Sequence, residues 1–347
     1  NHISLGAKMV DYAGFSMPIY YQGINLEHNH VRQSVGIFDV SHMGQVIVEG
    51  KESLKFLQNI TTNDVSKLII GKVQYSCITN EIGGILDDLL LYKLSENKFM
   101  LVVNASNTDK IIRWMSKHNK YGLHIENITH KNGLIALQGP KALNLLQQIT
   151  DYDLSTISYY SFDYIDLLDE KNILVSATGY TGAGGFEIYA EKIIIQKIWK
   201  ALFDIKNSDL LPIGLGARDT LRMEMGYCLY GNEINEETNP IEAGLSWIVD
   251  FNKQFIGSNI LKKKQIKKKI IGFELEEKGI PRKGYDLVNE KNKKIGYVTS
   301  GTMSPYLKKS IGIGFIYENM LFDIFFILIR NRKIKVNLVK FPFVKNN

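Results

Sequence analysis

One stretch of twelve residues says most about how this chain folds: Glu81-Ile82-Gly83-Gly84-Ile85-Leu86-Asp87-Asp88-Leu89-Leu90-Leu91-Tyr92. A Gly-Gly pair is a strong signal for chain reversal, and the apolar run after it has the length and composition of a β-strand. Successive strand residues point to opposite faces, so Asp87 and Asp88 cannot point the same way. We therefore predict a strand with one aspartate on each face.

Both faces of this strand are apolar. The face of Asp87 carries Ile85, Leu89 and Leu91, and the face of Asp88 carries Leu86, Leu90 and Tyr92. At least one carboxylate is then partly buried, which costs free energy unless the group is paired or hydrogen-bonded. Such an acid is a candidate for chemistry or ligand binding. The alternative is a turn-capping aspartate beside a surface aspartate, and the residues alone leave both open.

The composition is that of a soluble globular protein. The chain has 347 residues, of which 45% are hydrophobic and 22% charged, and this length suits roughly two or three domains. Cys77 and Cys228 form neither a disulfide framework nor a metal-spaced pair, which suits a reducing compartment. No apolar run approaches the ~20 residues of a membrane span, so we expect no membrane partner. A targeting peptide removed before Asn1 would leave no trace.

The order of expected elements predicts α+β packing. Residues 1–45 mix helix-like and turn-like pieces. Between residues 45 and 130 come a strand, a helix over 52–60, two strands around the Gly-Gly turn, a strand over 99–103 and a helix over 109–117. Helices packed on an antiparallel sheet suit this order. Beyond it we expect a strand over 133–138 and helices over 141–149, 192–203 and 218–227.

A run of lysines gives the clearest boundary signal. It reads Lys262-Lys263-Lys264-Gln265-Ile266-Lys267-Lys268-Lys269. Six like charges in eight residues suit a solvated linker or an exposed helix end. After the run, strands over 270–276, 294–300, 311–316, 323–329 and 333–339 are separated by short turns, which predicts a small all-β domain.

Two further polar positions are candidate ligand contacts. Arg218 and Asp219 lie in the first turn of a helix that follows glycines, where the helix dipole opposes an arginine. Arg218 is either solvated beside an Asp219–Arg222 pair, or held ready for an acceptor that its planar fork suits. Glu187 follows the glycine-dense loop 178–185 within an apolar strand. It is either a strand-surface acid or a bidentate acceptor for two parallel N–H groups, as on a pterin.

The remaining reactive residue types give weaker signals. The seven histidines, His42 among them, show no metal spacing and are interpreted as structural. Cys228 lies in an apolar stretch and is interpreted as core. The chain has no phosphate loop and no G-x-G-x-x-G dinucleotide fingerprint.

Six motifs occur in a fixed order along the chain: Gly6-Ala7-Lys8-Met9-Val10-Asp11, Asp39-Val40-Ser41-His42-Met43-Gly44, Gly83-Gly84-Ile85-Leu86-Asp87-Asp88, Thr178-Gly179-Tyr180-Thr181-Gly182, Gly214 to Arg222, and Thr299-Ser300-Gly301-Thr302-Met303-Ser304-Pro305. This is the order found in the T-protein of the glycine cleavage system. The chain closely resembles that aminomethyltransferase family over essentially its whole length.

The resemblance implies an α+β fold of three domains around a central folate channel. Residues 1–45 and 133–250 would form a discontinuous folate-binding domain, residues 46–132 an inserted α+β domain with the catalytic strand, and residues 266–347 a C-terminal β-barrel domain. The implied activity transfers the methylene carbon of the aminomethyl-lipoyl H-protein to tetrahydrofolate and releases ammonia. Tetrahydrofolate is then a substrate, the lipoylated H-protein is the partner, and no metal is expected.

The resemblance also implies roles for individual residues. Asp88 would be the catalytic aspartate, close to the folate nitrogens, and would orient or help deprotonate the folate. Glu187 and Arg218 would be the polar contacts of the pocket. The other folate-pocket positions would be Met43, Tyr75, Leu90, Tyr92, Val102, Asn104 and Tyr180. Asp87 is instead expected to satisfy backbone donors around the Gly83-Gly84 turn. Ala183 stands where the family commonly has an acid, which weakens only a contact at the rim.

Three other functional classes of protein are alternatives to this family. Folate-binding relatives that act in iron–sulphur assembly carry a Lys-Gly-Cys segment, whereas this chain has Gly226-Tyr227-Cys228. Sarcosine and dimethylglycine oxidising enzymes carry a flavin domain or partner. Nucleic-acid binding is the weakest alternative, because the lysines are not interleaved with stacking aromatics.

The lysine run is either a docking site for H-protein or a plain linker. The expected setting is the bacterial cytoplasm, or the mitochondrial matrix if a transit peptide preceded Asn1.

Overall fold

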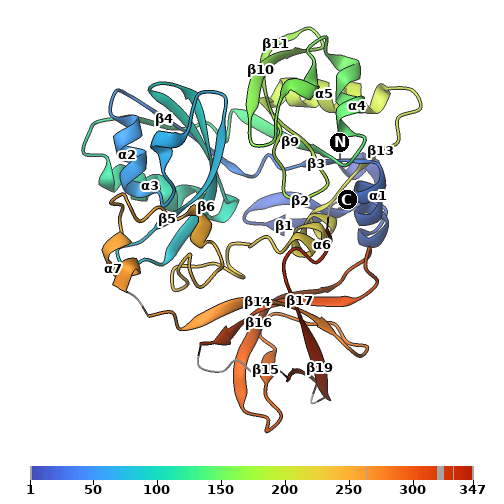
Figure 1. Cartoon of the computed structure of the whole chain (residues 1–347). Helices are drawn as coiled ribbons and strands as arrows, with labels where there is room; N and C mark the ends of the chain where they lie inside the picture. Colours follow the sequence, from blue (N-terminus) through green and yellow to red (C-terminus); the bar gives the residue numbers. More distant parts are fainter. Residues whose placement is uncertain (1, 264, 319–323, 331, 346–347) are drawn as a thin grey trace.

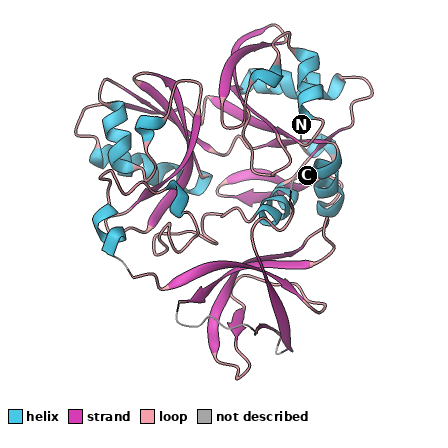
Figure 2. Cartoon of the chain, in the orientation of Figure 1, coloured by secondary structure: helices cyan, strands magenta, loops and turns pink. Residues whose placement is uncertain are grey.

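The computed structural model describes residues 2–263, 265–318, 324–330 and 332–345. This part of the chain holds three larger sheets and one small hairpin, and Figure 1 shows three bodies arranged around a common centre. Figure 2 shows helices beside the two upper sheets, whereas the lower body is built from strands. The predicted α+β fold with a C-terminal β-barrel is confirmed.

Six strands form the first sheet, in the order β10 (Phe162–Leu167), β11 (Glu170–Ser176), β12 (Gly185–Glu191), β9 (Asn132–Gln138), β3 (Val35–Asp39) and β13 (Leu210–Pro212). Neighbours are antiparallel except β13 and β3. Helices α4 (Ala142–Leu146) and α5 (Lys192–Asp204) cover an apolar core on one face. Helices α1 (Ile24–Gln33) and α6 (Leu215–Met225) pack on each other beside β3. The sheet thus positions α6, whose first turn holds Arg218.

Five antiparallel strands form the second sheet, in the order β5 (Val73–Thr79), β6 (Ile85–Ser95), β7 (Lys98–Val103), β4 (Gly44–Glu49) and β8 (His124–Asn127). Helices α2 (Ser53–Ile60) and α3 (Thr108–His118) pack on one face, around a core that includes Phe56 and Ile111. The predicted helices over 52–60 and 109–117 are confirmed within one residue at each end. The strand predicted from the Gly-Gly turn is β6, and it lies between β5 and β7.

The C-terminal body is a closed barrel. Its order is β14 (Lys268–Leu275), β17 (Ser310–Tyr317), β16 (Lys294–Met303), β15 (Asp286–Val288), β18 (Phe325–Ile329) and β19 (Arg332–Val339). Closure pairs every strand on both sides, which removes the exposed edges of an open sheet. The predicted strand over 323–329 is β18; residue 323 itself lies outside the described residues.

A hairpin near the N-terminus differs from the prediction of helix-like and turn-like pieces. Strands β1 (Lys8–Tyr12) and β2 (Phe15–Tyr20) pair only with each other. The turn between them has positive φ at Ala13 (53°) and Gly14 (82°), as a two-residue hairpin turn requires. Alanine is not a usual residue for that conformation, so the sequence carried no clear hairpin signal. The tip of the hairpin lies at the central cavity described below.

The lysine run joins the second body to the barrel. Helix α7 (Ser258–Lys263) ends inside the run and β14 begins at Lys268; Lys264 lies outside the described residues. Lys262, Lys263 and Lys267 are exposed, as predicted for a solvated segment. Lys268 is different, because its ammonium donates to Thr238 and Tyr297 and lies 4.4 Å from the centre of the Phe315 ring. One lysine of the run is therefore a structural contact of the barrel.

Candidate active site

A cavity of about 1570 Å³ lies between the three bodies. Its wall combines β5 to β7, the glycine-dense loop before β12, the first turns of α6, and the barrel segment 301–303. Of the predicted site residues, nine line it: Met43, Tyr75, Asp88, Leu90, Val102, Asn104, Tyr180, Glu187 and Arg218. These residues are up to 175 positions apart in sequence, and tertiary folding brings them to one space.

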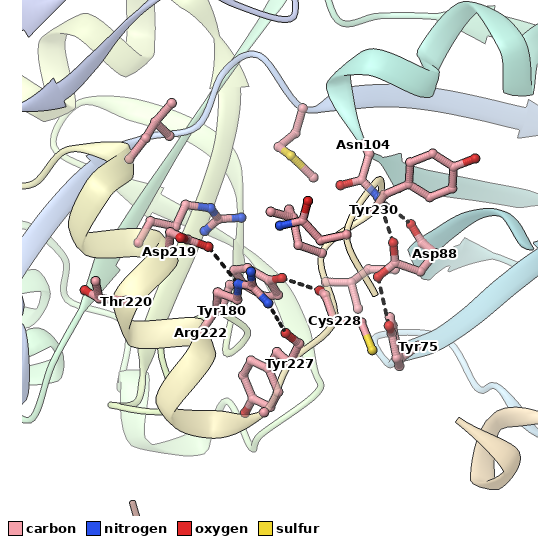
Figure 3. A pocket seen from close by; sticks show the side chains of 18 of the residues that line it. Tyr75, Asp88, Asn104, Tyr180, Asp219, Thr220, Arg222, Tyr227, Cys228 and Tyr230 are labelled. Atoms are coloured by element: carbon pink, nitrogen blue, oxygen red, sulfur yellow. Dashed lines mark hydrogen bonds and ion pairs between the residues drawn. The ribbon is translucent and has the colours of Figure 1, made fainter. Parts of the chain in front are cut away.

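Strand β6 places its two aspartates on opposite faces, as predicted. Leu89 and Leu91 pack with the helices on the side of Asp87, whereas Asp88 and Leu90 face the cavity. The Asp88 carboxylate accepts a hydrogen bond from the Tyr75 hydroxyl (2.8 Å to Oδ2) and one from the Asn104 amide (2.8 Å to Oδ1). Figure 3 shows both donors converging on it. Asp88 is thus held in one orientation at the cavity wall.

Asp87 has a role that the sequence did not predict. It is fully buried, and its carboxylate accepts from the Asn104 main-chain N–H (3.0 Å), the Asn104 side-chain amide (2.8 Å) and the Asn107 amide (2.6 Å). The prediction that Asp87 accepts hydrogen bonds from backbone donors of the Gly83-Gly84 turn is wrong. The Asn80 side chain satisfies that turn instead, accepting from the N–H groups of Ile82 and Gly84.

Burial changes the acidity of both aspartates. Loss of solvation raises the pKa of Asp87 to about 8, with the charge of Asp88 as the second cause. Burial also raises the pKa of Asp88, although its bonds from Tyr75 and Asn104 work in the opposite direction. The two groups are neighbours and titrate together, so the pair resists carrying two negative charges. A carboxyl group that can hold or release a proton near neutral pH suits acid–base chemistry.

The Gly-Gly turn is needed for a second reason besides chain reversal. A Cβ on Gly84 would lie 1.7 Å from the carbonyl oxygen of Glu236, because residues 235–238 cross directly over the turn. The Ile85 N–H donates to the carbonyls of Asn235 (3.1 Å) and Thr238 (3.0 Å). The segment before the barrel therefore fixes the start of the strand that carries Asp88.

Glu187 lies in the cavity wall with one oxygen already engaged. Thr178 donates to Oε2 (2.5 Å), and the Tyr189 hydroxyl lies 3.4 Å from the same atom. Burial raises the pKa of Glu187. Both protein donors therefore engage the same carboxylate oxygen, and the role of Glu187 as a bidentate acceptor stays a prediction.

Tyr92 does not line the cavity, contrary to the prediction. Its ring is fully buried behind the wall, and its hydroxyl bonds to the Tyr189 hydroxyl (2.8 Å), which reaches Glu187. Strand alternation put Tyr92 on the correct face. Alternation cannot reveal that the first sheet covers this face two residues beyond Leu90, because that depends on how the two sheets pack.

Arg218 points toward the cavity from the first turn of α6. Its guanidinium lies 4.6 Å from the centre of the Tyr180 ring and makes no ion pair within the described residues. The predicted helical pair of Asp219 with Arg222 also forms, at 2.8 Å. The Asp219–Arg222 pair is therefore confirmed, Arg218 is half-buried, and its role toward an acceptor stays a prediction.

Arg222 belongs to a buried cluster that sequence reasoning missed. Besides Asp219, it binds the fully buried carboxylate of Glu233 (2.9 Å) and donates to Ser300 of the barrel (2.8 Å). Figure 3 shows its guanidinium between Asp219 and the Tyr227 main-chain carbonyl, to which it also donates (2.9 Å). Helical spacing predicted only its pair with Asp219, because Glu233 and Ser300 lie outside that helix. The cluster ties α6 to the barrel.

His42 lies at the cavity as well as in the core. It is 3% exposed, its ring meets Tyr12 edge to face at 5.4 Å, and Nδ1 has no partner among the described residues. Burial, with the charge of Arg218 as the second cause, lowers the pKa of His42 to about 4. The imidazole is then neutral at pH 7. Cys77 and Cys228 are both free and buried.

No group of three or more histidine, cysteine, aspartate or glutamate side chains in the described part of the chain is arranged to hold a metal ion. No helix there is both long and apolar enough to cross a membrane.

The chain is similar to known proteins over nearly its full length. Residues 1–253 match the family described as GCVT N-terminal domain, and residues 268–345 match the glycine cleavage T-protein C-terminal barrel domain. The aminomethyltransferase of Flavobacterium psychrophilum is 48% identical over 351 aligned positions, covering 99% of this chain and 97% of that protein. That of Bacteroides thetaiotaomicron is 49% identical, covering 99% and 98%.

A solved structure gives the same result for the fold. The crystal structure of glycine cleavage system aminomethyltransferase T from Bartonella henselae superposes with a TM-score of 0.91 at 32% identity. The match covers 99% of this chain and 96% of that one.

Proposed function

The chain belongs to the glycine cleavage T-protein family of aminomethyltransferases, and on that premise we propose that Asp88 is its catalytic carboxylate and that the central cavity binds tetrahydrofolate. The observation that supports this best is the Asp88 carboxyl, fixed by Tyr75 and Asn104 at the wall of the cavity. Mixing the protein with aminomethylated H-protein and tetrahydrofolate, and measuring ammonia and methylenetetrahydrofolate, tests the activity.

The polar groups of the cavity suit a folate. Oε1 of Glu187, the oxygen that neither Thr178 nor Tyr189 contacts, can accept an N–H of the pterin, and the guanidinium of Arg218 can donate to an oxygen or nitrogen. Met43, Leu90 and Val102 supply apolar walls for a flat ring. A mostly apolar pocket with a few convergent polar groups is the usual form of a small-molecule site.

The reaction explains why a well-placed carboxyl group is useful. The methylene carbon loses its bonds to the amino nitrogen and the lipoyl sulphur and gains two bonds to folate nitrogens. Two protons leave the folate N–H groups, and one ends on ammonia and one on the dihydrolipoyl thiol. Asp88 would orient a folate N–H and accept its proton as the nitrogen attacks. Its raised pKa brings that proton affinity closer to neutral pH, where general bases are most effective.

Replacing Glu187 with glutamine should weaken folate binding at least several-fold. The side chain keeps its shape but loses its charge, and a charge-assisted hydrogen bond is worth ~1.5–3 kcal/mol. Calorimetric titration with tetrahydrofolate measures the change. Glu191→Gln is the matched control, because Glu191 is an exposed residue at the end of the same strand, β12. Equal affinities of wild type and Glu187→Gln would remove Glu187 from the pocket.

The lipoylated H-protein is the partner we propose, and the exposed lysines of the run that precede β14 are its proposed steering site. Lys262, Lys263 and Lys267 give the segment a local positive charge that would attract an acidic protein. Charges at the rim of an interface act mainly on the association rate and its salt dependence.

Changing these three lysines to glutamine should therefore slow association with H-protein and flatten its dependence on salt. Turnover at limiting H-protein, measured between low and physiological ionic strength, reports the effect. The control changes Lys192, Lys200 and Lys206, which are also exposed but lie on or just after α5 of the first body. Lys268 is kept, since its contacts are structural. An identical salt dependence for wild type and the run variant would leave the segment a plain linker.

We also propose the division into residues 1–45 with 133–250, 46–132 and 266–347. It is supported by the sheets, which draw on residues 35–39 with 132–212, on 44–127 and on 268–339. The bacterial relatives support a cytoplasmic setting.

A further inference from the structure

Asp87 lies outside the cavity wall but touches the residue that holds Asp88. The Asn104 side-chain nitrogen is 2.8 Å from Asp87 Oδ1 and 2.8 Å from Asp88 Oδ1. An amide nitrogen carries two hydrogens, so one N–H can be directed at each carboxyl group. The Asn104 main-chain N–H donates to the other Asp87 oxygen at 3.0 Å. Asp87 thus holds Asn104 at two points.

We propose that Asp87 is a positioning residue for the transfer reaction: it fixes the Asn104 amide so that the second N–H of that amide orients Asp88 toward the substrate. The inference rests on the proposed function, in which Asp88 is the catalytic carboxylate. It assigns Asp87 to the reaction although its side chain lies on the helix-covered side of the sheet.

The local structure explains why Asn104 needs such a fixed partner. Strand β7 ends at Val103, and Asn104 begins the turn Ala105–Asn107 that leads into α3. Asn104 therefore lies just beyond the last residue of β7, and its side chain is held by other contacts than the strand pairing. Asp87 supplies that restraint from β6, and Asn107 donates to Asp87 (2.6 Å) from the far end of the same turn. A displacement of about 1 Å in a positioned group can reduce a rate by ~10²-fold.

The surroundings of Asp87 keep its own titration distinct. The titratable groups near it in the described residues are Asp88 on the same strand, Cys77 on β5, and Tyr230 with the nearby Lys110. Burial raises the pKa of the Cys77 thiol and of the Tyr230 phenol, so both stay neutral near pH 8. Hydrogen bonds to Tyr230 and Glu236 outweigh burial and raise the pKa of Lys110, so its ammonium stays charged. An ionisation near pH 8 in this region therefore belongs to the aspartate pair.

A double-mutant cycle tests the inference. Asp87→Asn should lower kcat by ~10–100-fold, because its amide nitrogen faces a donor and Asn104 loses one anchor. Asn104→Ala should lower kcat as well. If Asp87 acts through Asn104, the double variant is no slower than the slower single variant, whereas independent roles multiply the two losses. All variants are compared well below their melting temperatures, so that a loss of folded protein does not enter kcat. Multiplied losses, or an Asp87→Asn enzyme with wild-type kcat, overturn the inference.

Asn107→Ala covers the case in which Asp87→Asn does not fold. Asn107 does not line the cavity, and its loss removes a donor that favours the ionised form of Asp87. We expect turnover to change with the ionisation of the aspartate pair, in which burial raises the pKa of Asp87 to about 8. Loss of the Asn107 donor should raise that pKa further and move the change to higher pH. An unmoved pH profile in a folded Asn107→Ala protein then overturns the inference.

Asp88→Asn, measured in parallel, distinguishes a failure of the catalytic assignment of Asp88 from a failure of the positioning role of Asp87. Near-normal turnover in Asp88→Asn would contradict the catalytic assignment itself. An inactive Asp88→Asn protein together with multiplied losses in the cycle would contradict only the role of Asp87.

Discussion

Replacing Asp88 with asparagine should slow aminomethyl transfer by ~10²–10⁴-fold, the usual contribution of acid–base participation. The side chain keeps its size but loses its charge and its basicity. Tyr75 and one Asn104 N–H would still find an acceptor in the remaining oxygen. Because burial raises the pKa of Asp88, the folded protein disfavours the ionised form. The neutral amide of Asp88→Asn should therefore lower the stability of the fold much less than it lowers turnover.

The measurement combines turnover at saturating tetrahydrofolate with a thermal melt. Asp166→Asn serves as the control, because Asp166 is an exposed aspartate on β10 whose carboxylate pairs with Lys171. It should leave turnover unchanged. A folded Asp88→Asn protein with near-normal turnover would contradict the assignment, whatever its affinity for folate.

Replacing Arg222 with methionine should destabilise the protein by about 3–5 kcal/mol, the usual cost of removing one partner of a buried ion pair. Arg222 is 1% exposed and Glu233 is fully buried, so the Glu233 charge would stay in the interior without its cation. Glu233 would keep its bonds from Thr299 (2.6 Å) and the Leu229 N–H (3.0 Å). These two bonds do not replace a positive charge.

Urea unfolding at pH 7 measures this loss. Arg332→Met is the matched control, because Arg332 pairs with Glu277 at 3.2 Å on the surface, where both partners are more than half exposed. A surface pair contributes only about 0–1 kcal/mol. The double variant Arg222→Met with Glu233→Gln should lose less than the sum of the single changes, since no buried charge is then left alone. A loss below 1 kcal/mol for Arg222→Met would show that the cluster is solvated in solution.

Local patterns predicted the secondary structure around the site well. The Gly-Gly turn and the apolar run predicted β6, and period-two alternation separated Asp87 from Asp88 before any packing was known. Helical periodicity located α2, α3 and α5 within a residue or two. The lysine run marked the passage to the barrel, whose strand pattern was visible in sequence. The hairpin of β1 and β2 was missed because its turn uses Ala13 at positive φ.

The sequence by itself thus determined which residues could carry chemistry, because strand alternation and turn chemistry depend on neighbours in the chain. Only the tertiary structure decided what each of them touches. Asp87 binds Asn104 and Asn107, 17 and 20 residues away, and not the adjacent turn. Tyr92 lies behind the wall because the first sheet covers it, and Arg222 reaches Ser300 across 78 residues. The partner of a buried polar group is set by which segments meet in the folded core, and local periodicity carries no information about that.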